Sequence, residues 1–261
     1  MSGPAEQIVR EFYDTYGWGK GEENELYRQF RPAYRAYHEK TVARTLECFA
    51  GRSGSLLVVG GGDLPPSHVK LASRFDAVTC IDISRVALDI TQSKLPSAKT
   101  ILGSICDAPF ETGSFDAVYA AHVVYHIDEK DQDRAVREMI RITRPGGRIV
   151  IVYDNPASPV RFAAGKVDGL RKRFAPARGV KQAGTRLYFY AHPLRWWRGF
   201  KDAATVRMLP WDIMGSYEER TLVSSDRMAR ALYGAAGWAE RYFPAAAVRL
   251  WQYPIIILDR H

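Results

Sequence analysis

The sequence has few cysteines, no long apolar run and no signal-like pattern in its first residues, and each shortage argues against a class of protein. Its three cysteines, Cys48, Cys80 and Cys106, are scattered and form no CxxC pair or Cys/His cluster with metal-ligand spacing. No stretch approaches the roughly 20 apolar residues that cross a bilayer, and the first residues lack the basic-then-apolar pattern of a secretory signal. We therefore expect a cytoplasmic protein with three buried thiols and no metal site.

The composition indicates a globular protein with an uneven charge. With 261 residues, 46% of them hydrophobic, the chain can bury a full core as one large domain with or without an elaboration. The formal net charge is +8, but residues 161–207 alone hold twelve basic residues against two acidic ones. Outside this segment the chain is close to neutral, so the positive charge of the protein is concentrated in residues 161–207.

The middle of the chain alternates between strand-like and helix-like segments. Short apolar runs typical of strands cover residues 56–59, 77–81, 100–102, 115–120 and 148–152. Patterns typical of helices cover residues 67–73, 84–94 and 131–142. This alternation predicts a parallel sheet with helices on both faces and a ligand site at the carboxyl ends of the strands.

The flanking regions have a different character. The first fifty residues have helical periodicity, and strand character returns near the end, at residues 204–209 and 251–258, on either side of a helical stretch at 225–239. Residues 154–210 are basic and aromatic and too long for a simple strand connection, so we expect an elaboration packed over the sheet.

The strongest chemical signal is a glycine-rich bend followed about twenty residues later by an acidic residue. Gly60, Gly61 and Gly62 come directly after an apolar strand, where glycine permits a sharp turn and lets a ligand approach the backbone. Asp82 ends the next strand, where a carboxylate can accept hydrogen bonds from both ribose hydroxyls of an adenosine-containing cofactor. An exposed Asp that caps the following helix is the alternative, although Ser84 suits that role as well.

A dinucleotide and S-adenosylmethionine (SAM) both contain adenosine, and the residues after the bend favour SAM. Dinucleotide sites bring pyrophosphate to a helix N-terminus through a third glycine. Pro65 stands at that position here and is followed by Pro66, and neither has the N–H donor that a phosphate would use. SAM has no phosphate and fits this sequence better.

Five segments, taken in order, resemble the motifs of the class I SAM-dependent methyltransferase superfamily, especially its small-molecule branch. They are residues 57–62, 80–84, 103–110, 115–126 and 144–148, with an N-terminal echo at 11–18. The resemblance extends over about residues 56–152. It implies a Rossmann-like α/β fold with a mostly parallel seven-stranded sheet, helices on both faces, N-terminal helices and a helical, aromatic cap insertion.

The resemblance also implies a division of the chain. We expect a helical lid at residues 1–54, a SAM-binding core at 55–153, a basic aromatic cap insertion at 154–203, and C-terminal strands and a helix that complete the sheet at 204–261.

The resemblance assigns cofactor-binding roles to individual residues. It implies that the glycine bend wraps the methionine part of SAM, that Asp82 binds the ribose and that Ile83 lies against the adenine. The remaining cofactor-binding residues that it implies are Ser104 and Ile105 at the adenine edge, Ala121 and His122 near the amino acid part, and Tyr13 and Tyr16 with Asp14 and Trp18 in the lid.

The sequence departs from the family pattern at three positions. The family usually has an acidic residue at Val58, a glycine at Leu64 and an Asp at Ser104. The first two positions concern the loop that holds the amino acid end of SAM, and the third concerns the adenine amino group. A serine hydroxyl can still accept that hydrogen bond, though without charge assistance, and Asp107 is a candidate substitute acid.

Methyl transfer needs an aligned nucleophile and, for a hydroxyl or protonated amine, a base. A histidine suits that task, and His126, which follows the fourth strand with His122, is our candidate; a structural histidine is the alternative. The cofactor would be SAM, with S-adenosylhomocysteine as the product and no metal. For the residues of the expected lid, the alternative is that they form an aromatic helix face packed in the core.

The basic, aromatic segment is the best clue to the acceptor. Arginines suit phosphates and carboxylates, while tryptophans and tyrosines can anchor at a bilayer interface or line an apolar pocket. We expect transfer to an oxygen or nitrogen of a small or lipid-linked acceptor, with anionic groups and peripheral membrane contact both compatible. Nucleic acid fits less well because no recognition module is present. The alternative functions are RNA methylation and SAM binding without turnover. The alternative for the basic segment is a solvent-exposed helical face without a binding role.

Overall fold

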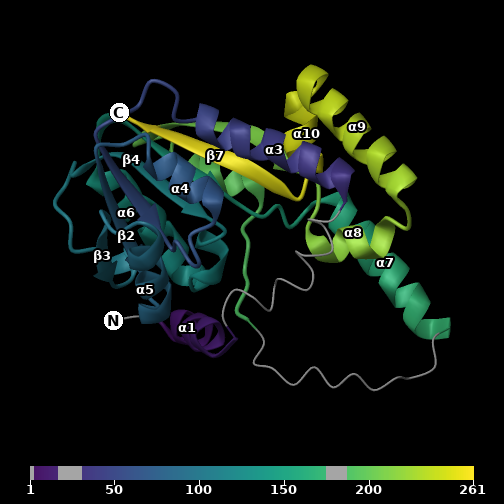
Figure 1. Ribbon diagram of the computed structural model, residues 1–261, viewed down its shortest axis with the longest axis horizontal. Coiled ribbons are helices and arrows are strands. Elements are labelled where there is room, and N and C mark those ends of the chain that lie inside the picture. Colours follow the sequence, from purple (N-terminus) through teal and green to yellow (C-terminus); the bar gives the residue numbers. More distant parts are fainter. Residues whose placement is uncertain (1–2, 17–30, 175–186) are drawn as a thin grey trace.

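The computed structural model describes residues 3–16, 31–174 and 187–261, and for residues 171–174 it describes the backbone alone (Figure 1). Seven strands form one sheet in the order β3-β2-β1-β4-β5-β7-β6. The strands are β1 (Ser55–Val59), β2 (Ala77–Asp82), β3 (Lys99–Leu102), β4 (Phe115–Ala121), β5 (Thr143–Val152), β6 (Ala204–Asp212) and β7 (Tyr253–Arg260).

Six of the seven described strands run in the same direction, and β7, which lies between β5 and β6, runs opposite to them. β1 pairs in parallel with both β2 and β4. The strand order therefore reverses at β1, near the centre of the sheet. β7 runs antiparallel to β5 and β6. This confirms the mostly parallel, seven-stranded α/β fold. β5 begins at Thr143, earlier than expected, because the turn at 144–147 lies inside an irregular stretch of the β4–β5 pairing.

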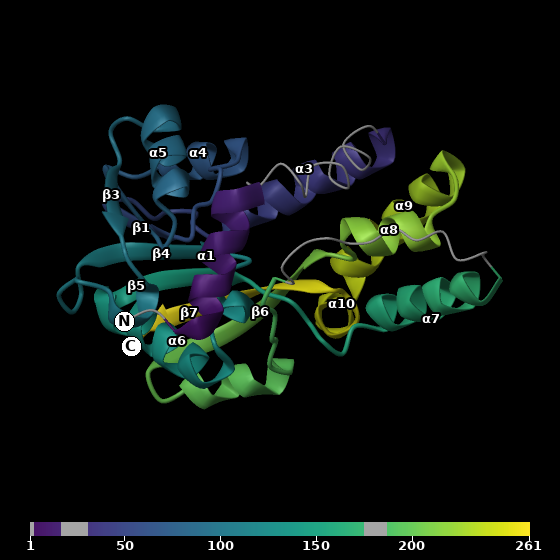
Figure 2. The ribbon, with the colours of Figure 1, turned by 90° about the horizontal axis from the view of Figure 1, so that it is seen from below.

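Helices cover both faces of the sheet (Figure 2). On one side lie α4 (Pro66–Ala72), α5 (Arg85–Lys94) and the C-terminal part of α3 (Pro32–Glu47), and on the other lies α6 (Gln132–Ile142). Proline at the start of α3 and α4 and the Ser84 hydroxyl, which accepts from Ala87 N, begin these helices as expected from helix-start chemistry.

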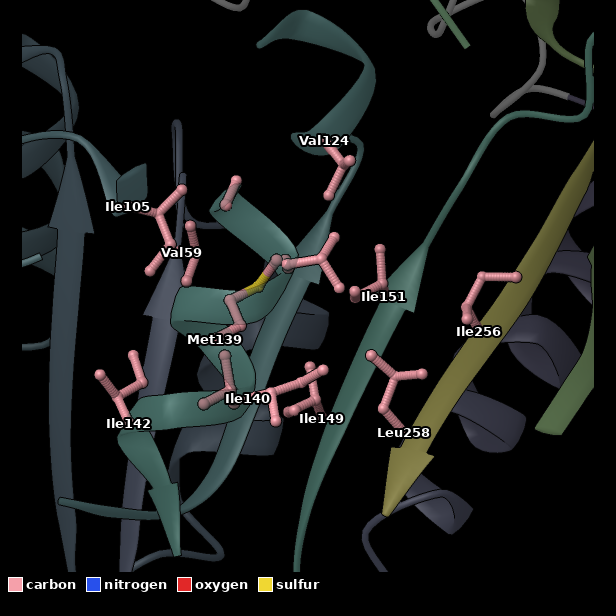
Figure 3. Close-up of a cluster of buried hydrophobic side chains, with 14 of the residues drawn as sticks. Val59, Ile105, Val124, Met139, Ile140, Ile142, Ile149, Ile151, Ile256 and Leu258 are labelled. Atoms are coloured by element: carbon pink, nitrogen blue, oxygen red, sulfur yellow. The ribbon is translucent and has the colours of Figure 1, made fainter. Parts of the chain in front are cut away.

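The core consists of two layers, one on each face of the sheet. Alternate residues of the central strands point in opposite directions, so Leu57 and Val59 join one layer and Leu56 and Val58 the other. Figure 3 shows the first layer, where Met139 and Ile140 of α6 pack against Ile149 and Ile151 of β5. These side chains are 5% exposed or less, which makes the sheet a rigid platform for whatever lies at its edge.

A helical lobe extends beyond one end of the sheet (Figure 1). It contains the rest of α3, α7 (Pro159–Phe174), α8 (Ser216–Leu222), α9 (Asp226–Tyr242) and α10 (Pro244–Leu250). A third apolar cluster, with Tyr37 and Tyr233 stacked at 4.8 Å between ring centroids, joins α3 to α9. The buried Glu240 carboxylate accepts from the Tyr37 hydroxyl, Arg44 and Trp251. The lobe is therefore built from helices of both the N-terminal and the C-terminal parts of the chain.

The N-terminal helices separate in space. α1 (Pro4–Tyr16) lies across the sheet edge where the parallel strands end, whereas α3 packs against α9 and β6 (Figure 2). Short 3-10 helices follow β3, β4 and the 187–193 loop, as η2 (Ile105–Asp107), η3 (Val124–His126), η4 (Glu129–Asp131) and η5 (Leu194–Phe200). No helix within the described ranges is long and apolar enough to cross a membrane.

Candidate functional site

A cavity of about 710 Å³ lies at the carboxyl ends of β1, β2 and β4, and α1 forms one of its walls. This is the edge at which the parallel topology predicts a ligand, because β1 is the point where the strand order reverses. The volume falls within the range of small-molecule and cofactor pockets. Two ends can be distinguished. The aspartate end contains Gly60–Gly62, Asp82, Ile83 and Ile105, and the histidine end contains Ala121, His122, His126 and Leu187.

The glycine bend between β1 and α4 is open to a ligand for a steric reason. Gly60 and Gly62 have φ of 62° and 56°, in the left-handed region that side chains rarely adopt. A Cβ on Gly60 would lie 2.5 Å from Val123 Cγ2, so this position also needs the space. The backbone of the bend therefore faces the cavity without side chains of its own at these positions.

The Asp82 carboxylate points at that bend. Its Oδ2 accepts from the backbone N–H of Gly62 at 3.3 Å, and its Oδ1 accepts from Ser84 N at 2.9 Å. The residue is 9% exposed, and burial raises the pKa of its carboxyl while these backbone N–H groups oppose the rise. An acceptor-only group beside an unobstructed backbone is an arrangement that can bind vicinal hydroxyls.

Leu64 shows what the missing third glycine costs. It has φ of 49°, a conformation that costs a side-chain-bearing residue roughly 1–2 kcal/mol. Its side chain is only 1% exposed, and its N–H donates to Gly61 O at 2.9 Å. The chain thus keeps the left-handed turn that a glycine would make without strain, and buries an apolar side chain that offsets the strain.

Helix α1 is held against the cavity by two carboxylates. Ser84 Oγ donates to Asp14 Oδ1 at 2.5 Å, and Ser104 Oγ donates to Glu6 Oε1. Tyr13 lies between these contacts along the helix and lines the cavity, where burial and then the nearby Asp82 raise the pKa of its hydroxyl. The contacts bring residues from the start of the chain onto loops that follow β2 and β3.

The histidine end contains two imidazoles with different hydrogen bonds. His126 Nδ1 lies 2.7 Å from the Tyr188 carbonyl oxygen, which can only accept, so Nδ1 carries the proton and Nε2 keeps its lone pair. His122 Nδ1 lies 2.7 Å from the Tyr125 hydroxyl. Burial lowers the pKa of His126 and lowers that of His122 to about 3. Both rings are therefore neutral near pH 7.

His122 also has a strained backbone. Its φ is 61°, and its N–H donates to Val152 O at 3.1 Å, which fixes it just beyond the end of β4. Its ring packs edge-on against Trp211 and Tyr253, each with 5.2 Å between centroids. Strained non-glycine residues held by their surroundings concentrate at functional sites.

Ten of the residues singled out in the sequence line this cavity: Tyr13, Gly60, Gly61, Gly62, Asp82, Ile83, Ile105, Ala121, His122 and His126. Ser104 and Tyr16 do not line it, and Trp18 lies outside the described residues. The Ser104 hydroxyl accepts from Cys106 N at 3.1 Å as an N-terminal cap and donates to Glu6. The sequence reasoning missed Glu6, Val9, Arg10 and His68. Glu6, Val9 and Arg10 lie on α1, which reaches the cavity only through long-range contacts, and His68 lies on the short helix α4, so no local pattern marks these residues.

The basic segment contributes little to the cavity wall as described. From residues 161–170 and 187–207 the wall includes Leu187 and no arginine. Arg161 instead pairs with Asp154 at 2.5 Å and lies over Phe189, and Arg207 pairs with Asp259 at 2.8 Å. The expectation that these arginines face the acceptor is therefore wrong for Arg161 and Arg207. Arg178, Lys181 and Arg186 lie outside the described residues.

Comparisons with known proteins agree with this geometry. Residues 59–151 match the family model described as "Methyltransferase domain". The "Ubiquinone/menaquinone biosynthesis C-methyltransferase UbiE" of Hahella chejuensis is 30% identical over 118 residues, which are 42% of this chain and 47% of the relative. The chain thus spans about half the length of the curated relatives it matches.

Solved structures resemble the whole chain at low identity. The geranyl diphosphate C-methyltransferase of Streptomyces coelicolor A3(2), with Mg²⁺, geranyl-S-thiolodiphosphate and S-adenosyl-L-homocysteine, has a TM-score of 0.61 at 16% identity, covering 99% of each chain. The N-methyltransferase NodS of Bradyrhizobium japonicum WM9, with S-adenosyl-l-homocysteine, has a TM-score of 0.57 at 14% identity, covering 99% of each chain. Residues 59–151, which include the glycine bend, Asp82 and both histidines, therefore match a methyltransferase domain, and the solved structures share the fold of the chain.

Proposed function

We propose that this protein is a SAM-dependent methyltransferase that acts on a small or lipid-linked acceptor. The observation that carries the proposal is the Asp82 carboxylate, which faces the glycine bend across the wall of a cavity large enough for the cofactor. When bound, SAM supplies a methyl group already activated on a sulfonium. The protein's task is then to bind and orient the two partners and to keep water out.

The aspartate end fits the cofactor's nucleoside. Asp82 would accept hydrogen bonds from the ribose hydroxyls, and Ile83 and Ile105 offer apolar surfaces for a purine. The bend at Gly60–Gly62 would receive the amino acid part, close to the backbone of Ala121 and His122. Each of these groups lines the same cavity, so one ligand can contact them all.

The histidine end suits the acceptor. His126 keeps a free Nε2 lone pair, because its other nitrogen donates to Tyr188 O, and it lines the cavity beside Ile127 and Leu187. A neutral imidazole can take a proton from a hydroxyl or an ammonium group as the acceptor is methylated. His126 is accordingly our candidate base, with His122 and Tyr125 as the neighbouring polar pair.

The histidine end of the cavity and the relatives both bear on the methylated atom and the acceptor. The residues favour oxygen or nitrogen because a base is present, whereas the relatives include enzymes named for transfer to carbon and to nitrogen. One solved relative was crystallised with geranyl diphosphate, an anionic lipid-like acceptor. Arg10 at the cavity wall and the apolar side chains of Val123 and Leu187 are compatible with such a molecule.

Titration calorimetry and a transfer assay test the proposal. We expect S-adenosylhomocysteine and SAM to bind with one site each, and labelled methyl to pass from SAM to one class among quinols, prenyl diphosphates and small amines. Absence of binding of both at millimolar concentration would contradict the proposal. Binding without transfer to any acceptor class would instead favour a cofactor-binding protein without turnover.

A further inference from the structure

The adenine side of the cavity presents an acidic group that comes from an unexpected part of the chain. If SAM binds as proposed above, its ribose lies at Asp82 and its purine lies between Ile83 and Ile105. The only N–H donor of an adenine joined to ribose is its exocyclic amino group. A protein that selects adenine therefore needs a hydrogen-bond acceptor at that edge.

Ser104 and Asp107, the two side-chain acceptors nearest to Ile105 in sequence, do not line the cavity. Ser104 has one hydroxyl proton, which it donates to Glu6, while the same oxygen accepts from Cys106 N. Asp107 is turned away: its side chain is 46% exposed, it pairs with Arg134 at 3.3 Å, and it does not line the cavity. Ser104 and Asp107 are thus poorly placed to recognise the amino group.

Glu6 on α1 is well placed. It lines the cavity together with Gly103 and Ile105, and it is only 6% exposed. Its Oε1 accepts from Ser104, while a carboxylate has two oxygens and about four acceptor sites. A buried carboxylate is stable only with sufficient donors, and an amino group of the ligand would supply one more.

We propose that Glu6 is the adenine-recognition residue of this protein and that it acts from the N-terminal helix. The Ser104 hydroxyl orients the carboxylate, and Glu6 accepts from the exocyclic amino group. The same helix is fixed at its far end by Asp14 on Ser84, the residue whose N–H binds Asp82. The contact that recognises adenine therefore also holds α1 against the cavity. This inference rests on the proposed function.

Calorimetry with two ligands tests the role of Glu6. The probes are S-adenosylhomocysteine and S-inosylhomocysteine, in which an oxygen replaces the amino group. We expect the unaltered protein to prefer the adenosyl ligand by roughly 10- to 100-fold, the range for a charged hydrogen bond. In Glu6→Gln this preference should fall to a few-fold or reverse, because an amide can donate to the inosyl oxygen.

A control and a rescue variant separate recognition from structure. Glu11→Gln alters an exposed carboxylate on the same helix and should leave both affinities unchanged. Adding Ser104→Asp to the Glu6→Gln variant returns an acid to the position that Glu6 contacts, and should restore the preference. If Glu6 only holds α1 in place, its loss should weaken both ligands equally and leave their ratio unchanged.

The outcomes distinguish this inference from the proposed function. If the unaltered protein binds neither ligand, both proposals fail. If it binds S-adenosylhomocysteine but shows the same ligand preference with and without the Glu6 carboxylate, the cofactor assignment stands and the role of Glu6 is wrong. A change of ratio that Ser104→Asp reverses supports both.

Discussion

The aspartate end and the histidine end of the cavity are built in different ways. At the aspartate end, both donors to Asp82 belong to short motifs at the ends of β1 and β2: Gly62 lies 20 residues before Asp82, and Ser84 lies two residues after it. At the histidine end, His126 depends on Tyr188, 62 residues further along the chain. Asp82 is therefore fixed by donors closer to it along the chain than the carbonyl that fixes His126, although α1 also reaches the aspartate end from 98 and 70 residues away, through Glu6 and Asp14.

This contrast suggests a division of labour. An end made of short motifs on a rigid sheet suits a constant ligand, whereas an end assembled from loops can change its acceptor without disturbing the sheet. The variants below test whether the two ends are functionally separable.

Loss of the candidate base should have the largest effect. We expect His126→Asn to lower kcat by about 100-fold or more, the usual contribution of a positioned base, with little change in S-adenosylhomocysteine affinity. Because burial lowers the pKa of His126, the acid limb of the unaltered kcat/KM profile should lie below the usual histidine range. The variant should lose that limb, and the exposed His261→Asn serves as control. A normal kcat would remove His126 from the reaction.

Removing the carboxylate at the aspartate end should weaken cofactor binding alone. We expect Asp82→Ala to reduce S-adenosylhomocysteine affinity by roughly 1–3 kcal/mol, the loss of charged hydrogen bonds. Since the pKa of Asp82 is raised, affinity in the unaltered protein should fall at a higher pH than for an ordinary Asp. Asp89→Ala, exposed on α5, is the matched control in calorimetry. Unchanged affinity in a folded Asp82 variant would contradict the site.

The glycine bend is where the two ends touch. Gly60→Ala would force a side chain into the left-handed region and against Val123, which lies at the histidine end. We expect a loss of about 1–2 kcal/mol in the free energy of unfolding, measured by chemical denaturation. At Gly61 a Cβ meets nothing closer than 3.6 Å, so Gly61→Ala should change stability by less than about 0.5 kcal/mol. Equal effects would show that neither strain nor Val123 matters.

The same contrast explains how far the sequence could predict the structure. The strands of the sheet could be predicted because apolar runs and glycine bends are local signals, and all seven expected strand regions match a strand. The helices of the lobe were harder. The helical pattern at 225–239 predicts α9 alone, because α8 and α10 have seven residues each, too short for a clear periodicity.

The site shows the same limit at the level of single residues. Asp82 and Gly60–Gly62 could be found because their chemistry is encoded in spacing along the chain. Glu6 could not be found, since nothing in the first helix indicates that it meets Ser104, 98 residues away. Predictions from the basic segment failed at Arg161 for a related reason, because the sequence could not reveal its pairing with Asp154.

That ion pair leads to the smallest effect, a pH dependence of stability. Asp154 follows β5 and is 1% exposed; burial raises the pKa of its carboxyl to about 6, although Arg161 opposes the rise. In the unfolded chain an Asp titrates near its ordinary value of about 4, so between these values the folded state binds more protons. Stability from this group is therefore present at low pH and lost as pH rises through 6.

Asp154→Asn should remove this dependence. Between pH 5 and pH 7 the free energy of unfolding of the unaltered protein should fall by about 1 kcal/mol relative to the variant. Urea denaturation at both pH values measures the difference, with the exposed Asp89→Asn as control. Arg161, which Asp154 holds over Phe189, lies beside the aromatic contacts of Tyr125 and His126. Equal slopes for the protein and the variant would mean that Asp154 stays ionised, and that the support behind the histidine end does not titrate in this range.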